Sequence, residues 1–233
     1  MSLKGSRKVI KVSGSYKTRS WNSDVEIQYF EKTRGGKYFL RKCLEKAREE
    51  DILFHSSTLH KNQLQPWFLS GWKISSELCV YTKKLTNNSN NSINKVPVKR
   101  RDFKTIDFKP LTELDKEIFA PYWRSSYETL LETLQSCRKN YLYTYEENNN
   151  ILGYCILGTT LKSSFVQRLA VHPKSQKKGV GSSLLCSVSK DMGKKNVQTI
   201  KLNTQLDNSA AKKLYQQNGF VVEADVLTIM SSR

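Results

Sequence analysis

The chain has 233 residues, and 38% of them are hydrophobic, an ordinary fraction for a folded protein with its own core. Its 39 basic and 21 acidic residues give a formal net charge of +18. Five cysteines without CxxC spacing favour neither a disulfide framework nor a zinc site, so we expect no metal. No uncharged apolar window is long enough for a membrane span, and residues 1–15 lack the apolar core of a signal peptide. We therefore expect a cytoplasmic protein outside the membrane.

The positive charge is concentrated in the first part of the chain. Residues 1–100 carry 20 basic and 8 acidic side chains, whereas residues 101–233 carry 19 and 13. Such a charge would suit a polyanion, for example ribosomal RNA. The sequence has no nucleic-acid motif and no regular alternation of basic and aromatic residues, so a solvated basic surface is the simpler interpretation.

Residues 1–85 alternate strand patterns with helix patterns. A turn at Gly35-Gly36 precedes an amphipathic segment with apolar residues at helical spacing, which predicts a helix up to about residue 50. The other predicted elements of this half are strands at 9–12, 25–30, 52–59 and 72–85, and a short helical segment at 62–70.

Residues 86–101, TNNSNNSINKVPVKRR, are rich in Asn and Ser and then basic, which predicts an exposed linker. We place the domain boundary there, between a first domain at 1–85 and a second at 102–233. For the second domain the pattern predicts, in order, a strand at 103–108, helices at 111–119 and 126–137, a hairpin at 141–145 and 151–159, a strand at 165–171, a helix at 180–192, a strand at 199–206, a helix at 209–217 and a last strand through residue 230.

The two halves share an order of elements. Gly71-Trp72 mirrors Gly219-Phe220, and each pair follows an earlier glycine turn, by 35 residues in the first half and 38 in the second. This spacing favours an internal duplication whose copies have diverged, although any chain of alternating strands and helices can give such an order. The first half has too few residues between 30 and 36 for a long glycine loop, so its copy would be degenerate.

The segment 165–193, FVQRLAVHPKSQKKGVGSSLLCSVSKDMG, carries the strongest chemical signal. Its pattern predicts a strand, a turn at Pro173, a loop with Gly179 and Gly181, and a helix. A helix start offers unpaired N–H groups and the positive end of the helix dipole, and glycine lets a ligand come close to the backbone. Such a loop suits a phosphate or pyrophosphate, but an ordinary tight turn into a helix has the same Gly-x-Gly pattern.

A second motif follows, Asn208-Ser-Ala-Ala-Lys-Lys-Leu-Tyr215-Gln-Gln-Asn-Gly-Phe220. Together with Gln176-Lys-Lys-Gly-Val-Gly181, it resembles the GNAT superfamily of N-acyltransferases, with its [QR]xxGx[GA] acyl-CoA loop and its NxxAxxLYxxxGF helix and turn. The resemblance covers residues 101–233, and the whole chain is similar to tandem GNAT proteins with one degenerate copy. It implies an α/β fold with a mixed sheet that splays between the strands at 165–171 and 199–206, flanked by helices, after a truncated GNAT-like first half.

The resemblance also implies an activity and a site. The expected activity is an N-acetyltransferase that moves an acetyl group from acetyl-CoA to a primary amine, either a protein N-terminus or a small molecule, in a ternary complex. The expected cofactor-binding residues are Leu169, Ala170, Val171, Gln176, Lys177, Lys178, Gly179, Val180, Gly181, Ser182 and Asn208. Backbone amides at 169–171 would bind pantetheine and the thioester oxygen, and the loop 176–182 would bind the pyrophosphate.

Tyr215 is the expected general acid for the departing thiolate, since a phenol carries a suitable proton. The alternative is a half-buried aromatic before a glycine turn. Lys177 stands where many relatives have glycine, which could alter the loop. His172, next to Pro173, is better explained by the turn than by catalysis.

No general base stands out, and water could serve. Glu128 and Glu132, one helical turn apart, are the first carboxylates to test, although a solvated helix face explains them equally well. Tyr122 and Trp123 would either shape the acceptor pocket or anchor the helices. His55 and His60, in the first half, are interpreted as structural or exposed.

Two other functions are compatible with parts of the sequence. One is a catalytically silent acyl-CoA-binding or scaffolding protein, which the intact motifs of the second half argue against. The other is a basic protein associated with the ribosome or with nucleic acid, whose binding would weaken steeply with salt and ignore CoA.

Overall fold

The structure is a computed structural model that describes residues 7–10, 13–85 and 95–233. The chain forms two compact units, one made of Met1–Cys79 with Ala224–Arg233 and the other of Val80–Glu223. The predicted boundaries placed residues 224–233 in the second domain, but in the structure this segment belongs to the first unit. The reason is pairing, because Ser231 pairs with His55 and Leu59 with Thr228. Most of the predicted linker, residues 86–94, lies outside the described residues.

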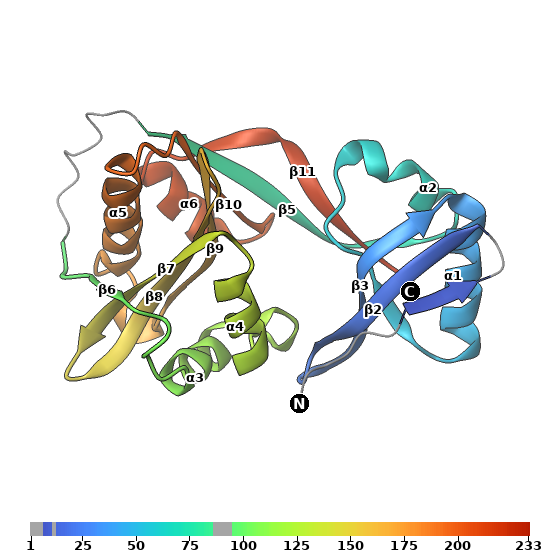
Figure 1. Ribbon diagram of the computed structural model, residues 1–233, viewed down its shortest axis with the longest axis horizontal. Coiled ribbons are helices and arrows are strands. Elements are labelled where there is room, and N and C mark those ends of the chain that lie inside the picture. Colours follow the sequence, from blue (N-terminus) through green and yellow to red (C-terminus); the bar gives the residue numbers. More distant parts are fainter. Residues whose placement is uncertain (1–6, 11–12, 86–94) are drawn as a thin grey trace. The chain divides into compact units, whose positions relative to one another are not determined.

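The first unit is a sheet with one main helix (Figure 1). Strand β2 pairs antiparallel with β1 and β3, β3 pairs parallel with β4, and β4 pairs antiparallel with β11. Strand β5 begins in this unit and β11 ends in it. The elements are β1 (Arg7–Ile10), β2 (Gly14–Asn22), β3 (Val25–Gly35), α1 (Lys37–Glu49), β4 (Leu53–His55), η1 (Lys61–Gln63), α2 (Gln65–Phe68), β5 (Lys73–Lys84) and β11 (Val221–Ser231).

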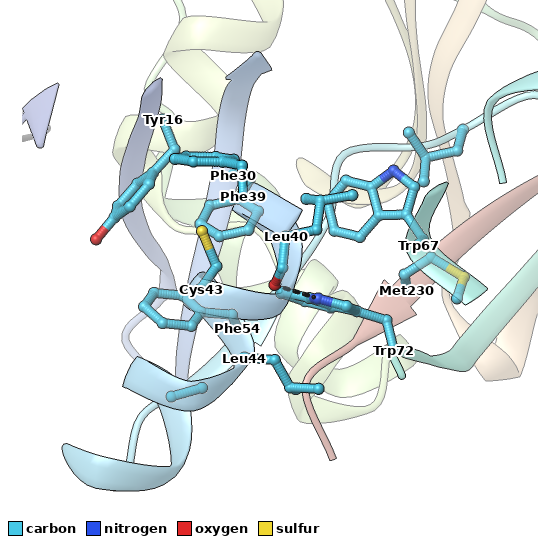
Figure 2. Close-up of a cluster of buried hydrophobic side chains, with 12 residues drawn as sticks. Tyr16, Phe30, Phe39, Leu40, Cys43, Leu44, Phe54, Trp67, Trp72 and Met230 are labelled. Atoms are coloured by element: carbon cyan, nitrogen blue, oxygen red, sulfur yellow. Dashed lines mark hydrogen bonds between the residues drawn. The ribbon is translucent and has the colours of Figure 1, made fainter. Parts of the chain in front are cut away.

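Aromatic side chains fill the core of this unit (Figure 2). Helix α1 buries the apolar face that its spacing predicts, made of Phe39, Leu40, Cys43, Leu44 and Ala47. The indole N–H of Trp72 donates to the carbonyl of Leu40 (3.0 Å), the bond drawn in Figure 2, so the only polar atom of this buried side chain is satisfied. The first unit therefore has a hydrophobic core of its own, to which Met230 of β11 contributes.

The second unit is a mixed sheet with helices on both faces (Figure 1). Its strand order continues from β11 through β5, β10, β9, β8 and β7 to β6. Helices α3 and α4 cover one face and α5 covers the other. The elements are β6 (Lys99–Arg101), α3 (Lys109–Ile118), η3 (Pro121–Trp123), α4 (Tyr127–Gln135), β7 (Lys139–Glu147), β8 (Asn150–Thr159), β9 (Ser163–Val171), η4 (Pro173–Ser175), α5 (Val180–Gly193), β10 (Thr199–Gln205) and α6 (Ser209–Gln217).

The two faces follow from the alternation of side chains along a strand. Tyr154, Ile156 and Ala170 belong to the core cluster under α3 and α4. Gly153 lies on the opposite face, where a Cβ would come within 3.0 Å of Val180 on α5. Because Ala170 pairs with Tyr154 and Val171 with Gly153, β9 presents its side chains alternately to the two helical layers.

Strands β9 and β10 are parallel neighbours only at their beginnings. Their registered pairs are Ser163 with Thr199, Ser164 with Ile200 and Phe165 with Lys201, whereas β9 runs on to Val171 and β10 to Gln205. The sheet is therefore mixed and open between these strands, as the predicted α/β fold requires.

One predicted strand is wrong. Residues 103–108 form turns and the approach to α3, and the edge strand is β6 instead, within the predicted linker. Strand β6 has no apolar alternation. Besides its antiparallel ladder with β7, ion pairs hold it, because both Lys99 and Arg101 bind the Glu146 carboxylate of β7. Phe108 is instead buried in the core under α3.

The two units share one local geometry. Gly71 (φ +90°) and Gly219 (φ +78°) end a helix in the left-handed conformation and close the same Schellman motif. The bonds run from Trp72 N–H to Trp67 O (3.2 Å) and from Gly71 N–H to Phe68 O (3.0 Å), and from Phe220 N–H to Tyr215 O and from Gly219 N–H to Gln216 O, both 3.0 Å. Trp67 thus occupies the place of Tyr215. Such a helix end is common in proteins, so the predicted duplication stays a prediction. The side chain at this place in the first unit is an indole, which cannot act as an acid.

Candidate active site

The glycine loop leaves a row of backbone amides at the start of α5. The first helical hydrogen bond is from Ser183 N–H to Gly179 O (2.9 Å), so the amides just before Ser183 precede the helical ladder. Upstream, the side-chain amide of Gln176 donates to Val171 O (3.0 Å) and ties the loop to the end of β9. Lys177 and Lys178 are exposed beside these amides. The loop is therefore an electropositive stretch of backbone.

Two loop residues have left-handed backbones. Gly179 has a φ of +87° and Lys177 a φ of +60°. For lysine this conformation costs on the order of 1 kcal/mol, whereas glycine adopts it without cost. Gly181 packs closely on α6, since a Cβ there would come within 2.9 Å of Leu214 Cδ2 and Leu214 would have to shift.

Helix α6 brings the second motif against this loop. Besides the contact between Gly181 and Leu214, the side-chain amide of Asn218 donates to Ser182 Oγ (3.0 Å). Asn208 caps α6, with its side-chain oxygen accepting from Ala211 N–H at 3.0 Å. The two motifs are therefore one structural assembly around the divergence of β9 and β10.

Tyr215 lies in this assembly with 7% of its surface exposed. Its ring contacts Tyr81 of β5 edge-on, at a centroid distance of 5.6 Å, and Phe220 at 6.1 Å. The packing fixes the ring, as a positioned acid needs.

A further contact at the loop carries no sequence signal. Ser183, which is buried, accepts through its Oγ the backbone N–H groups of Lys95 (3.0 Å) and Val96 (3.2 Å). This anchoring brings the exposed side chain of Lys95 against Gly179, where an added Cβ would lie 2.8 Å from Lys95 Cδ. In the described part of the chain, no ion pair is recorded for Lys95. Three lysines, at 95, 177 and 178, thus surround the loop.

His172 has a structural role. Its Nδ1 accepts from Lys174 N–H (3.1 Å) and its Nε2 lies 3.0 Å from the Glu117 carboxylate. Both contacts are satisfied together when the ring carries its proton on Nε2, which then donates to Glu117. Both nitrogens are occupied, which argues against a catalytic base here.

Neither of the other candidate bases stands out. Glu128 accepts from the hydroxyl of Ser126, the N-cap of α4, and this hydrogen bond lowers the pKa of Glu128. A lowered pKa makes a weaker base. Glu132 lies exposed on the same helix. In the first unit, burial lowers the pKa of His55 to about 4, and His60 pairs with Asp225 (2.5 Å).

The described residues contain no group of three or more His, Cys, Asp or Glu side chains close enough to hold a metal ion. None of the described helices is both long and apolar enough to cross a membrane.

Comparisons with known proteins agree with this geometry. Residues 138–222 match the model of an acetyltransferase (GNAT) domain. A ribosomal protein bS18-alanine N-acetyltransferase of Haemophilus ducreyi is 31% identical over 114 residues, which covers 49% of this chain and 76% of that protein. The chain belongs to the GNAT acetyltransferase family. It is an N-acetyltransferase. A second bS18-alanine N-acetyltransferase, from Haemophilus influenzae, is 32% identical over 114 residues, which covers 49% of this chain and 75% of that protein.

Solved GNAT structures share the fold over nearly the whole chain. A tandem GNAT protein from the clavulanic acid biosynthesis pathway has a TM-score of 0.68 and 14% identity, covering 94% of this chain and 78% of that one. A GCN5-related N-acetyltransferase of Sphaerobacter thermophilus has a TM-score of 0.66 and 16% identity, covering 94% and 76%. At these identities the likeness concerns the fold, and it confirms the predicted GNAT fold.

Proposed function

We propose that this GNAT protein uses acetyl-CoA and transfers its acetyl group directly to a primary amine. The observation that carries the proposal is the assembly of the glycine loop, helix α6 and the diverging strands β9 and β10. A pyrophosphate needs unpaired amides and positive charge, and the start of α5 offers both. An extended pantetheine arm needs strand edges that are not paired with each other, and the divergence beyond Phe165 and Lys201 offers these.

The residues of the chain would then have distinct roles. Acetyl-CoA supplies an acetyl thioester. Amides of Leu169, Ala170 and Val171 would hold the arm and polarise the thioester oxygen, and residues 176–182 would hold the pyrophosphate. Asn208, which caps α6, would contact the arm from the side of β10.

The transfer itself exchanges one bond for another. The amine nitrogen forms a bond to the acetyl carbon while the carbon–sulfur bond breaks, and the amine loses a proton to water or to a nearby carboxylate. Tyr215 would give its hydroxyl proton to the departing sulfur. Because an ammonium has no lone pair, the acceptor must react as the neutral amine, and the rate should rise with pH until the amine is deprotonated.

We propose a protein N-terminus as the acceptor, ahead of small amines. The support is the likeness to two enzymes named for acetylating the alanine of ribosomal protein bS18. An α-amine has a pKa of about 8, against about 10.4 for a lysine side chain, so more of it is neutral near pH 7.

The test is acetylation of short peptides by the full chain. The reaction is measured by the release of CoA thiol, and the acetylated position is located by mass spectrometry. Peptides with a free N-terminal alanine, the same peptides with a blocked N-terminus and an internal lysine, and a small diamine are compared. The proposal expects acetylation at the α-amine of the alanine peptide. Acetylation of only the lysine or the diamine would overturn the acceptor assignment. If CoA thiol is released with neither peptide and not with the diamine, the choice of a primary amine is overturned.

A further inference from the structure

A buried ion pair lies on the face of β9 opposite α5. Arg168 of β9 binds Asp115 of α3 with two nearly parallel bonds, Nε to Oδ1 (2.9 Å) and Nη2 to Oδ2 (2.5 Å). The Asp115 side chain is 0% exposed and that of Arg168 is 16% exposed. The hydroxyl of Tyr154 also donates to Asp115 Oδ1, at 2.5 Å. Hydrogen bonds thus surround the carboxylate, as a buried charge requires.

The same pair holds the turn between α3 and α4, residues 119–126. Ser125 N–H donates to Asp115 Oδ2 (2.6 Å), and Arg168 Nη2 donates to the carbonyl of Trp123 (2.6 Å). The guanidinium also stacks on the ring of Phe119, with its carbon 3.7 Å from the ring centroid. The turn is therefore fixed at its beginning, middle and end by two side chains from other elements.

Stability alone does not account for this arrangement. Burying two charges costs desolvation free energy, and apolar residues of similar size often replace a buried pair at no loss of stability. What an apolar pair lacks is direction, because the guanidinium fork fixes the carbonyl of Trp123 and the carboxylate fixes the amide of Ser125. These bonds hold the turn at a fixed position relative to Arg168. Arg168 immediately precedes residues 169–171, where we propose that the thioester binds.

We propose that Asp115 and Arg168 are positioning residues that set the aromatic turn 119–126 as a wall of the amine-acceptor site. The inference rests on the proposed function. In this proposal the turn contacts the amine acceptor, and the glycine loop on the other face of the sheet binds the cofactor. A shift of about 1 Å in such a wall can cost about 10²-fold in rate, which makes the role measurable.

The test uses the double variant Asp115→Asn with Arg168→Met in the full chain. It removes both charges, while the amide oxygen of the introduced asparagine can still accept from Tyr154 or Ser125. The matched control is Tyr143→Phe, which removes a buried hydrogen bond to Asp191 on the α5 face (3.1 Å) and does not touch the turn. The probes are acetyl-CoA and the alanine peptide, read by calorimetry and by steady-state kinetics.

The inference expects the double variant to raise the KM of the peptide or lower kcat by about tenfold or more, with the Kd of acetyl-CoA within about twofold of wild type. Hydrogen exchange at residues 119–126 should quicken without change at 176–183. Tyr143→Phe should leave both sets of values unchanged. Unaltered peptide kinetics in a folded double variant would overturn the inference, as would an equal kinetic loss in the control.

A second variant covers loss of folding in the first. Arg168→Lys keeps the charge, but an ammonium lacks the planar fork that spans Asp115 and Trp123. It should show a smaller change in peptide kinetics of the same sign, and wild-type kinetics would contradict the proposal. Wild-type protein that acetylates no amine would instead refute the proposed function, so the two failures are distinguishable.

Discussion

Tyr215 is the residue on which the proposed chemistry depends most directly. Tyr215→Phe removes the hydroxyl and keeps the ring that packs on Tyr81 and Phe220. We expect the single-turnover rate with the alanine peptide to fall by about 10²-fold or more, and the Kd of acetyl-CoA to stay unchanged. Single-turnover kinetics is needed because product release can hide the chemical step.

Tyr81→Phe is the matched control for this prediction, since it removes a hydroxyl from the neighbouring ring. It should keep the wild-type single-turnover rate. If Tyr215→Phe keeps that rate as well, Tyr215 is an aromatic wall, and water or another residue supplies the proton.

Lys95 gives a second prediction at this scale. If its ammonium lies near the bound pyrophosphate, Lys95→Ala should raise the Kd of acetyl-CoA by about two- to fivefold, the effect of one solvent-exposed ion pair, and the difference should shrink at high salt. Calorimetry at two salt concentrations measures both effects. The control is Lys190→Ala, in the last turn of α5, which should change neither the Kd of acetyl-CoA nor its salt dependence. A Kd that Lys95→Ala leaves unaltered at low salt would contradict the assignment.

The sequence predicts site residues that belong to a local motif. It does not predict residues whose role depends on contacts with distant parts of the chain. Gln176, Gly179, Gly181, Asn208 and Tyr215 stand in two motifs, and the structure brings those motifs together. No sequence signal separates Asp115 from other acidic residues of an amphipathic helix. Its role appears only when β9 brings Arg168 to it across 53 positions of sequence.

The same limit holds at the scale of elements. Helices α1, α4 and α5 can be predicted because each carries apolar residues at helical spacing. Strand β6 carries no apolar alternation, because backbone pairs and charged side chains hold it to β7, whereas residues 103–108 have apolar side chains that are typical of a strand. The end of β11 pairs with β4 in the first unit, and no local pattern reports such a long-range partner.

The Glu146 cluster that holds β6 gives a prediction about pH. Burial acts to raise the pKa of Glu146, but hydrogen bonds from Arg101, Lys99 and Thr144 outweigh it and lower the pKa to about 2. A lowered pKa means that the ionised carboxylate stabilises the fold above the unfolded-state pKa of about 4.3 and that this stabilisation is lost as the pH falls towards 2.

Glu146→Gln should therefore lower the urea midpoint of unfolding at about pH 7, and the difference from wild type should vanish at about pH 2. Glu147→Gln, the neighbouring exposed carboxylate, is the control. A difference that is constant over this range would show that the charge of Glu146 does not stabilise β6.

At the scale of the whole molecule, the division into units predicts what truncation does. Residues 80–85 belong to the second unit, and Tyr81 is only 1% exposed there. A chain of residues 101–233 lacks strand β5, which is the neighbour of β10 in the sheet. Its loss leaves an edge of β10 and the ring of Tyr215 uncovered. We expect it to melt at a lower temperature than the full chain, or to aggregate.

Tyr81→Ala in the full chain isolates the local part of this effect, and it should cost about 3–5 kcal/mol of unfolding free energy, as large buried aromatics do. A truncated chain that melts with the full chain would show that the strand is dispensable. The degenerate first copy, the cytoplasmic location and a ribosomal or nucleic-acid partner stay predictions at this scale.

The most direct test of the central claim is calorimetric titration of the full chain with acetyl-CoA. We expect one site per chain, because the glycine loop of the second unit has no counterpart among the described residues of the first. Replacing both Lys177 and Lys178 by Ala should weaken that site, because it removes two positive charges beside the loop. These substitutions leave Gly179 and Gly181 unchanged. Two equivalent sites, no binding, or binding that the double substitution leaves unchanged at low salt would contradict the assignment of acetyl-CoA to this loop.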